Sequence, residues 1–331
     1  MRPINTKPIG ILGLGVHVPE KILSNFDLEK MVETNDEWIR TRTGIRERRI
    51  LSDGESPSDI ALPAAQKAIA DSGLSVKDID AVVYCTYTPD HFMPPSSCIM
   101  QGRLGLQSCI AFDLNAACSG FVFGLQAAYA LVVSGQAKHP LVIGADCNSR
   151  VLDYTDRETC VLFGDGAGAV VLGNVPEGRG ILGHSSGSDG TGAFLITQKV
   201  GGGAHPYDKE NIASKDRFMK MNGREVYKFA VRVINEALEA ALADAGLDVK
   251  DIDLLVPHQA NVRIIESAMK RFGFDPKNVV INMAHYGNTS AASIPLALDS
   301  ARRDGRLKPG VTCGLVAFGA GLTHGATILR W

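Results

Sequence analysis

Two short apolar runs along the chain have the same surroundings. VVYC (residues 82–85) and LLVP (254–257) each follow a helical segment that closes with a glycine, Gly73 or Gly246. Such runs, bounded by turn residues and preceded by helices, predict buried strands. Strands that alternate with helices favour a mainly parallel sheet that is covered by helices on both faces.

A change of pattern occurs in the segment FDLNAACSGFVFGL (residues 112–125). Residues 112–115 alternate in the manner of a strand, whereas residues 119–134 are apolar on nearly every side, which is typical of an enclosed helix. Cys118 therefore lies where a strand gives way to a helix.

The chain contains an internal repeat. Residues 68–83 (AIADSGLSVKDIDAVV) align without a gap with residues 241–256 (ALADAGLDVKDIDLLV) at an offset of 173, and 11 of the 16 positions are identical. We therefore expect two similar halves, residues 1–178 and 179–331, joined at a turn-rich segment near 174–180. The patterns favour an α/β fold with two outer layers of helices and one pair of helices between two sheets, that is, a five-layered α-β-α-β-α architecture with pseudo-twofold related halves.

The repeat also predicts which residues occupy equivalent corners. An offset of 170, which relates Gly135 to Gly305, maps Cys118 onto Asn288, and the offset of 173 maps Cys85 onto His258. If the halves pack about a pseudo-twofold axis, the nucleophilic Cys118 of the first half and His258 and Asn288 of the second can converge.

These three residues suit nucleophilic chemistry. Cys118 stands at a helix start, where the partial positive charge favours the thiolate, which is the nucleophilic form. The small pair that follows it, Ser119 and Gly120, leaves room for a ligand. His258 follows a buried strand and could donate a hydrogen bond or exchange a proton. Asn288 precedes a helix, so its local sequence fits a helix cap as well as a catalyst.

Composition excludes several classes of protein. The net charge of −2 does not favour nucleic acid, and no apolar run approaches the length of about 20 residues that spans a bilayer. The first ten residues lack the apolar core of a signal peptide, so we expect a cytoplasmic protein. Seven cysteines without a C-x-x-C pair suggest neither a disulfide framework nor a metal site.

Glycine runs and basic residues complete the pattern. GDGAGA (164–169) and GAGLTHG (319–325) lead into strands, whereas a dinucleotide-binding loop must open a helix, so we expect no Rossmann-type cofactor site. Such turns suit backbone oxyanion donors instead. Basic residues accompany Trp38 in EWIRTRTGIRERR (37–49), and a flat ring beside Arg42 suits a ligand that carries phosphates.

Taken together, several motifs resemble the β-ketoacyl-acyl-carrier-protein synthase III family of the thiolase fold: ETNDEWIRTRTGIRERR, DLNAACSGF, LFGDGAGAVVL, VPHQANVRII, HYGNTSAASIPLAL and AFGAGLTHGA. The resemblance runs from about residue 8 to the end of the chain. It implies a cofactor-independent acyltransferase that starts type II fatty-acid synthesis. Cys118 would take an acyl group from acyl-CoA, and malonyl-acyl-carrier protein would then lose carbon dioxide and attack that group.

The resemblance also implies a role for each residue. His258 and Asn288 would stabilise the enolate, and the backbone N–H groups of Cys118 and Ala320 would form the oxyanion hole. Other expected roles follow the same motifs: CoA binding by Trp38, Arg42, Arg157, Gly223 and Asn261, carrier-protein docking by Arg263 and Lys270, and, in a homodimer, an acyl pocket completed by Met93 of the second copy.

Three alternatives stay open on the sequence alone. A Cys-His-Asn hydrolase would release free acid from acyl-CoA, although the C-G-[SA]-C-[WY] signature of papain-like enzymes is absent. A related thiolase-fold acyltransferase would transfer acyl groups in a secondary pathway. An inactive carrier-protein-binding scaffold would be expected to have a broken site, whereas all three motifs are intact.

Overall fold

The computed structural model describes residues 5–331, so residues 1–4 of the first predicted half lie outside the described residues. The strands are β1 Ile9–His17, β2 Ile22–Ser24, β3 Glu47–Arg49, β4 Ala81–Cys85, β5 Ile110–Leu114, β6 Pro140–Cys147, β7 Asp165–Asn174, β8 Gly180–Ser188, β9 Ile196–Thr197, β10 Lys220–Met221, β11 Leu254–Pro257, β12 Thr312–Gly319 and β13 Thr323–Arg330. The α-helices are α1 Asn25–Leu28, α2 Asp36–Thr43, α3 Pro57–Asp71, α4 Ser96–Arg103, α5 Gly120–Val133, α6 Arg157–Cys160, α7 Gly223–Ala245, α8 Val262–Phe272, α9 Met283–Tyr286 and α10 Ser293–Arg303.

The repeated sequence builds the same local structure twice. SVKD and DVKD each form a short 3-10 helix, η1 (Val76–Asp78) and η6 (Val249–Asp251), and each begins with a capping box, Ser75 with Asp78 and Asp248 with Asp251. A strand follows in both cases, β4 or β11. Local capping chemistry thus places the helix-to-strand connection alike in the two halves.

Two sheets repeat one strand order. The first sheet runs β1-β7-β6-β4-β5, and the second runs β8-β13-β12-β11. The expectation of a mainly parallel sheet is wrong, because only β6, β4 and β5, and in the second sheet β11 and β12, are parallel. The short connection 320–322 makes β12 and β13 antiparallel, since a parallel pair needs a long crossover.

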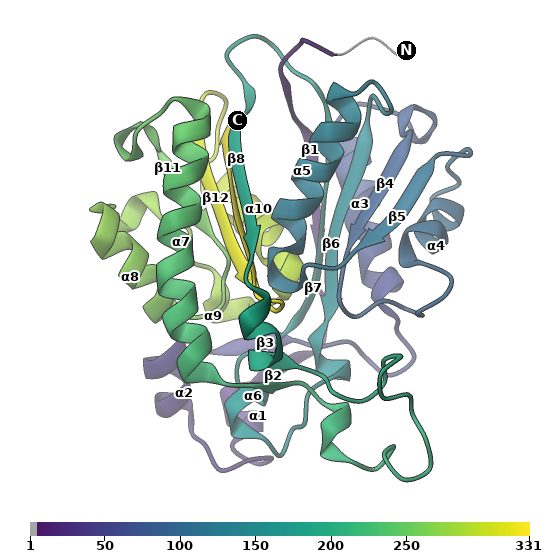
Figure 1. The fold of residues 1–331 in the computed structure, drawn as a ribbon, viewed down its shortest axis with the longest axis vertical. Helices are drawn as coiled ribbons and strands as arrows, with labels where there is room; N and C mark the ends of the chain where they lie inside the picture. Colours follow the sequence, from purple (N-terminus) through teal and green to yellow (C-terminus); the bar gives the residue numbers. More distant parts are fainter. Residues whose placement is uncertain (1–4) are drawn as a thin grey trace.

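Five layers result (Figure 1). Helices α3 and α4 cover the outer face of the first sheet, and α7, with α8 beside it, covers the second, while α5 and α10 lie between the sheets. The apolar core is accordingly divided: one cluster lies between the sheets, and one lies under each outer layer of helices. The five-layered architecture predicted from the sequence is confirmed.

The middle layer shows which positions of the halves correspond. A 3-10 helix, η2 (Ala117–Ser119), precedes α5, and η8 (Ser290–Ala292) precedes α10, so the offset here is 173. Ala117 and Ser290 share a left-handed backbone, with φ of 46° and 52°. The sequence-based pairing of Cys118 with Asn288 is therefore wrong, because the offset between the halves is still 173 at this point and not 170.

The position equivalent to Asn288 is instead Asn115. Their side chains make the same turn: Asn115 Oδ1 accepts from the N–H of Ala117 at 3.2 Å, and Asn288 Oδ1 accepts from the N–H of Ser290 at 2.8 Å. Each asparagine thus holds the turn that opens a central helix.

The central helix α5 is less enclosed than its sequence predicts. Phe121, Val122 and Leu125 are buried, but Ala130 is exposed because one flank of the helix reaches the edge of the layer. Within residues 5–331, no helix is long and apolar enough to cross a membrane, and no cluster of His, Cys, Asp and Glu could hold a metal ion.

Candidate active site

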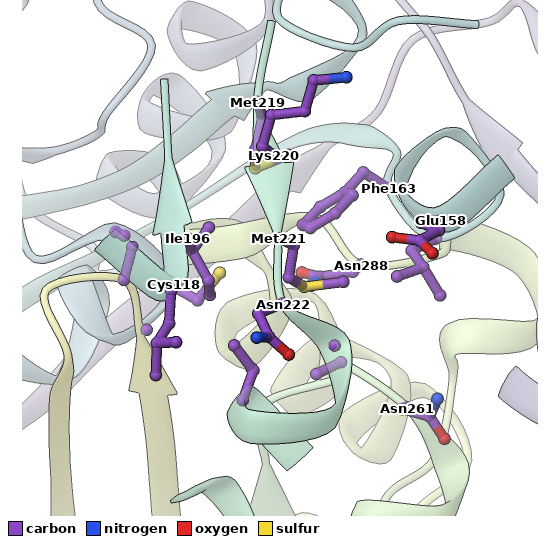
Figure 2. A pocket seen from close by; sticks show the side chains of 18 of the residues that line it. Cys118, Glu158, Phe163, Ile196, Met219, Lys220, Met221, Asn222, Asn261 and Asn288 are labelled. Atoms are coloured by element: carbon purple, nitrogen blue, oxygen red, sulfur yellow. The ribbon is translucent and has the colours of Figure 1, made fainter. Parts of the chain in front are cut away.

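The structure brings the three predicted catalytic residues to one cavity of about 1180 Å³. Cys118 comes from the first half of the chain, and His258 and Asn288 come from the second. Figure 2 shows side chains from both halves around this cavity, with Cys118, Asn261 and Asn288 labelled. The duplicated fold therefore builds a shared site between elements that are distant along the chain.

Cys118 sits in a tight turn against the end of β12. Ala117 adopts φ 46°, which is uncommon for a residue with a side chain and indicates a constrained turn at a functional position. A Cβ atom on Gly319 would lie 2.8 Å from Cys118 N and 2.9 Å from Ser119 N. Only glycine allows this approach between the turn and β12.

Burial, rather than the helix start, dominates the acidity of Cys118. Desolvation raises the pKa of its thiol to about 12, because protein atoms displace much of the water around a side chain that is still partly open to the cavity. The nearby polar side chains of Ser290 and Asn288 lower that pKa only in part, and the negative charge of the buried Asp146 raises it further. This shift is opposite in direction to the one expected from the helix start, and it favours a neutral thiol over a thiolate at rest.

Asn288 is held by its backbone and presents its amide to Cys118. Its N–H donates to Leu162 O at 2.8 Å, and its C=O accepts from Gly164 N at 3.0 Å. Since its Oδ1 accepts from Ser290 N, the Nδ2 group is the one that can donate to the sulfur or to a ligand. Asn288 does not cap a helix: the residue at the cap of η8 is Thr289.

His258 is buried and neutral. It is 2% exposed, and desolvation lowers its pKa to about 3. Nδ1 lies 2.6 Å from Ser293 Oγ, and the ring packs edge-on against Phe318. Nε2 is buried without a hydrogen-bond partner among residues 5–331. When the Ser293 hydroxyl donates to Nδ1, Nε2 carries the proton and can donate it to a ligand in the cavity.

Two backbone N–H groups complete the inner end of the site. Cys118 and Ala320 both line the cavity, and within residues 5–331 neither N–H donates to a backbone carbonyl. The N–H groups of Cys118 and Ala320 therefore belong to two turns that are in contact at Gly319 and that line one cavity.

Residues with large or charged side chains line the outer part of the cavity. Two guanidinium groups lie over the Trp38 ring, with Cζ of Arg42 4.7 Å and Cζ of Arg157 4.9 Å from the ring centroid. Both arginines are exposed. Gly223 and Asn261 line the same cavity, and Asn261 also caps α8 by accepting from Arg263 N at 2.9 Å.

Three predicted residues lie outside the cavity lining. Arg263 and Lys270 are exposed on α8, seven positions apart and hence on the same helix face. Met93 is 86% exposed in the loop between β4 and α4, beside the equally exposed Phe92. Their sequence-predicted roles require partners that bind at these surfaces.

Several residues of the site carried no signal of their own in the sequence reasoning. Ser290 contacts Cys118, Ser293 orients His258, and Thr323 lines the cavity beside Ala320. The internal offset of 173 could have identified Ser290, because it maps Ala117, the neighbour of Cys118, onto that position.

Two family models match the chain. One, described as 3-oxoacyl-[acyl-carrier-protein (ACP)] synthase III, matches residues 112–199, and the other, described as the C-terminal part of the same enzyme, matches residues 242–331. The matched segments contain Cys118 on one side and His258, Asn288 and Ala320 on the other.

Similar proteins cover the whole chain. The β-ketoacyl-[acyl-carrier-protein] synthase III of Symbiobacterium thermophilum is 51% identical over 98% of both chains. The crystal structure of the β-ketoacyl-[acyl-carrier-protein] synthase III of Thermus thermophilus has a TM-score of 0.91 at 45% identity, covering 97% of this chain and 99% of that one. The priming β-ketosynthase of the R1128 polyketide pathway has a TM-score of 0.90 at 36% identity, covering 100% and 98%.

Proposed function

The chain belongs to the β-ketoacyl-[acyl-carrier-protein] synthase III family of thiolase-fold acyltransferases, and on that premise we propose which of its residues perform the condensation. The observation that carries the proposal is the convergence of Cys118, His258, Asn288 and Ala320 on one cavity. The enzyme makes a 3-ketoacyl carrier protein from an acyl-CoA and malonyl-acyl-carrier protein. The higher identity to the synthase of S. thermophilum than to the polyketide ketosynthase favours a role in fatty-acid synthesis over a secondary pathway.

Acyl transfer to Cys118 comes first. The sulfur attacks the thioester carbonyl of acyl-CoA, the new carbon–sulfur bond forms, and the bond to the CoA sulfur breaks. Because burial keeps the Cys118 thiol neutral at rest, its proton has to leave during this step, and the departing CoA sulfur accepts it. The N–H groups of Cys118 and Ala320 stabilise the negative charge that develops on the carbonyl oxygen.

Condensation follows on the same sulfur. The malonyl thioester of the carrier protein loses carbon dioxide, and its enolate oxygen accepts hydrogen bonds from His258 Nε2 and Asn288 Nδ2. The carbanion attacks the acyl-Cys118 carbonyl, the carbon–sulfur bond breaks, and the released thiolate takes a proton from water. A neutral His258 suits this task, since Nδ1 accepts from the Ser293 hydroxyl and the proton then stands on Nε2, which has no other partner among residues 5–331.

The outer cavity is proposed to bind the CoA portion of the substrate. Trp38, Arg42 and Arg157 offer one flat ring and two exposed guanidinium groups for the adenine and the phosphates. Gly223 and Asn261 line the path between that end and Cys118. No further cofactor and no metal are required by these steps.

Protein partners are proposed from the surface. Arg263 and Lys270 present two cations on one face of α8, which suits an acidic carrier protein. The edge strand β5 is half-buried and unpaired on one side, and this supports a homodimer in which Met93 of the second copy completes the acyl pocket. We also propose a boundary between the halves at 178/179, between β7 and β8, a cytoplasmic location, and no nucleic-acid or membrane partner.

Acylation of Cys118 tests the proposal. The protein is incubated with acyl-CoAs of increasing chain length, and the acylated peptide is identified by its mass. We expect one acyl group on the peptide that contains Cys118, complete loss of that label in Cys118→Ala, and full labelling in the control Cys98→Ala, which removes an exposed thiol. An unlabelled Cys118 peptide, or labelling that survives in Cys118→Ala, would contradict the proposal.

A further inference from the structure

Two hydroxyl groups connect the Cys118 turn to the Ala320 turn. Ser119 Oγ lies 2.6 Å from Thr323 Oγ1, although the two residues are 204 positions apart. Both hydroxyls also reach the carbonyl oxygen of Ala116, Ser119 Oγ at 2.8 Å and Thr323 Oγ1 at 3.0 Å. Thr323 Oγ1 lies 3.1 Å from the carbonyl oxygen of Ala320 as well. We call Ser119 and Thr323 the hydroxyl pair.

The protons of the hydroxyl pair are used within this network. Each hydroxyl has one proton to donate. One proton lies between the two oxygens, since 2.6 Å is a normal distance for an O–H···O hydrogen bond. The other is donated to the carbonyl of Ala116 or Ala320. The hydroxyl pair therefore joins two turns and has no proton left to give to a substrate.

These two turns carry the two N–H groups of the proposed oxyanion hole. The Ala116 carbonyl lies two residues before Cys118, and the Ala320 carbonyl belongs to the second donor residue itself. The turns already touch at Gly319, and the second turn is anchored behind by mutual hydrogen bonds between Leu322 and Asp189 at 2.8 and 3.0 Å. The hydroxyl pair adds a side-chain link between the turns, and one of its members, Thr323, lines the cavity.

We propose that Ser119 and Thr323 are positioning residues that fix the spacing between the N–H groups of Cys118 and Ala320. This proposal rests on the proposed function, because it assumes that these N–H groups bind the thioester oxygen. An oxyanion hole works only when its donors are about 2.7–3.1 Å from the oxygen. Loss of the link lets the turns move apart. This reduces the stabilisation of the transition state more than it reduces the affinity for acyl-CoA.

Thr323→Val tests the inference, because valine keeps the shape and removes the hydroxyl. The measurement is the single-turnover rate constant for acyl transfer from acetyl-CoA to Cys118, over a range of acetyl-CoA concentrations. We expect a fall of about 10- to 100-fold in the maximal rate, since a misplacement of about 1 Å can cost about 10²-fold, with the half-saturating concentration changed less than about threefold. Thr323→Ser, which keeps the hydroxyl, should retain most of the rate.

The chain supplies matched controls. Thr327 lies on the same strand, β13, and is fully buried with a hydroxyl that has no hydrogen-bond partner among residues 5–331, so Thr327→Val should leave the rate unchanged. Ser119→Ala is the second variant, and Ser97→Ala, which removes another buried and unpartnered hydroxyl, is its control. Because the hydroxyl pair forms one network, Ser119→Ala with Thr323→Val should be no slower than the slower single variant.

The outcomes separate the two proposals. If the wild-type protein is not acylated on Cys118, the proposed function fails. If the wild type is acylated and Thr323→Val is as fast as Thr327→Val, the positioning role is refuted while the function stands. The positioning role is also refuted if Thr323→Val and Thr323→Ser lose rate alike and the loss parallels a fall in the unfolding temperature. The hydroxyls would then only stabilise the fold.

Discussion

The buried imidazole of His258 should make the folded protein sensitive to mild acid. Burial lowers its pKa to about 3, with no charged group contributing, whereas a histidine in an unfolded chain has a pKa of about 6.5. Protons therefore bind preferentially to the unfolded state. The stability that the neutral ring supports is complete above about pH 6.5 and is lost progressively as the pH falls from 6.5 toward 3.

The size of the effect at pH 5 follows from these values. That pH lies about 1.5 units below the pKa in the unfolded chain, and each unit corresponds to about 1.4 kcal/mol, so the loss is about 2 kcal/mol. A domain is typically stable by about 5–15 kcal/mol, so a change of this size is measurable. His258→Asn removes the titrating ring and keeps a polar partner for Ser293.

The assay is urea unfolding at pH 7.5 and pH 5.0, at one protein concentration, for the wild type and His258→Asn. The wild type should lose about 2 kcal/mol more than the variant on going to pH 5. His17 and His324, whose pKa values burial also lowers, are present in both proteins and cancel in the comparison. Equal losses in the two proteins would refute the reasoning, since His258 would then titrate near its usual pKa in the folded state.

Three further changes test the site. Asn288→Ala should slow malonyl decarboxylation about 10²-fold and acylation less than about 10-fold, because it removes a donor to the enolate; equal losses would indicate a purely structural asparagine. Gly319→Ala should reduce acylation at least about 10-fold, because its Cβ would press on Cys118 N at 2.8 Å, and an unchanged rate would contradict the observed approach. Alkylation of Cys118 by iodoacetamide, corrected with Cys118→Ala, should accelerate about tenfold per pH unit from pH 7 to 10, because the thiol has a pKa of about 12; a plateau below pH 9 would contradict this.

The layers of the fold could be predicted from the sequence because each copy of the repeat is specified by signals that lie close together in the chain. Capping boxes and helix-closing glycines are encoded within a few residues, so residues 68–83 and 241–256 form the same unit in both halves. Strand direction was not predictable in the same way. It depends on the connection that follows each strand, and the short turn 320–322 makes β12 and β13 antiparallel.

The sequence motifs identified the residues that we propose as catalytic, but they did not predict the environment of those residues. The acidity of Cys118 depends on burial and on Ser290, Asp146 and Asn288, three residues that are distant from it in the sequence. The offset of 170 paired Cys118 with Asn288, whereas the backbone pairs Ala117 with Ser290. Contacts such as that between Ser119 and Thr323 arise only when the two halves pack together.

The most direct test of the account is the fate of the acyl group on Cys118. Acyl-enzyme is prepared with labelled acetyl-CoA, freed of excess substrate, and mixed with malonyl-acyl-carrier protein. The account predicts that the label leaves the Cys118 peptide and appears in a 3-ketoacyl carrier protein, together with one carbon dioxide per turnover. Release of the label as free acetate, or its transfer without loss of carbon dioxide, would contradict it.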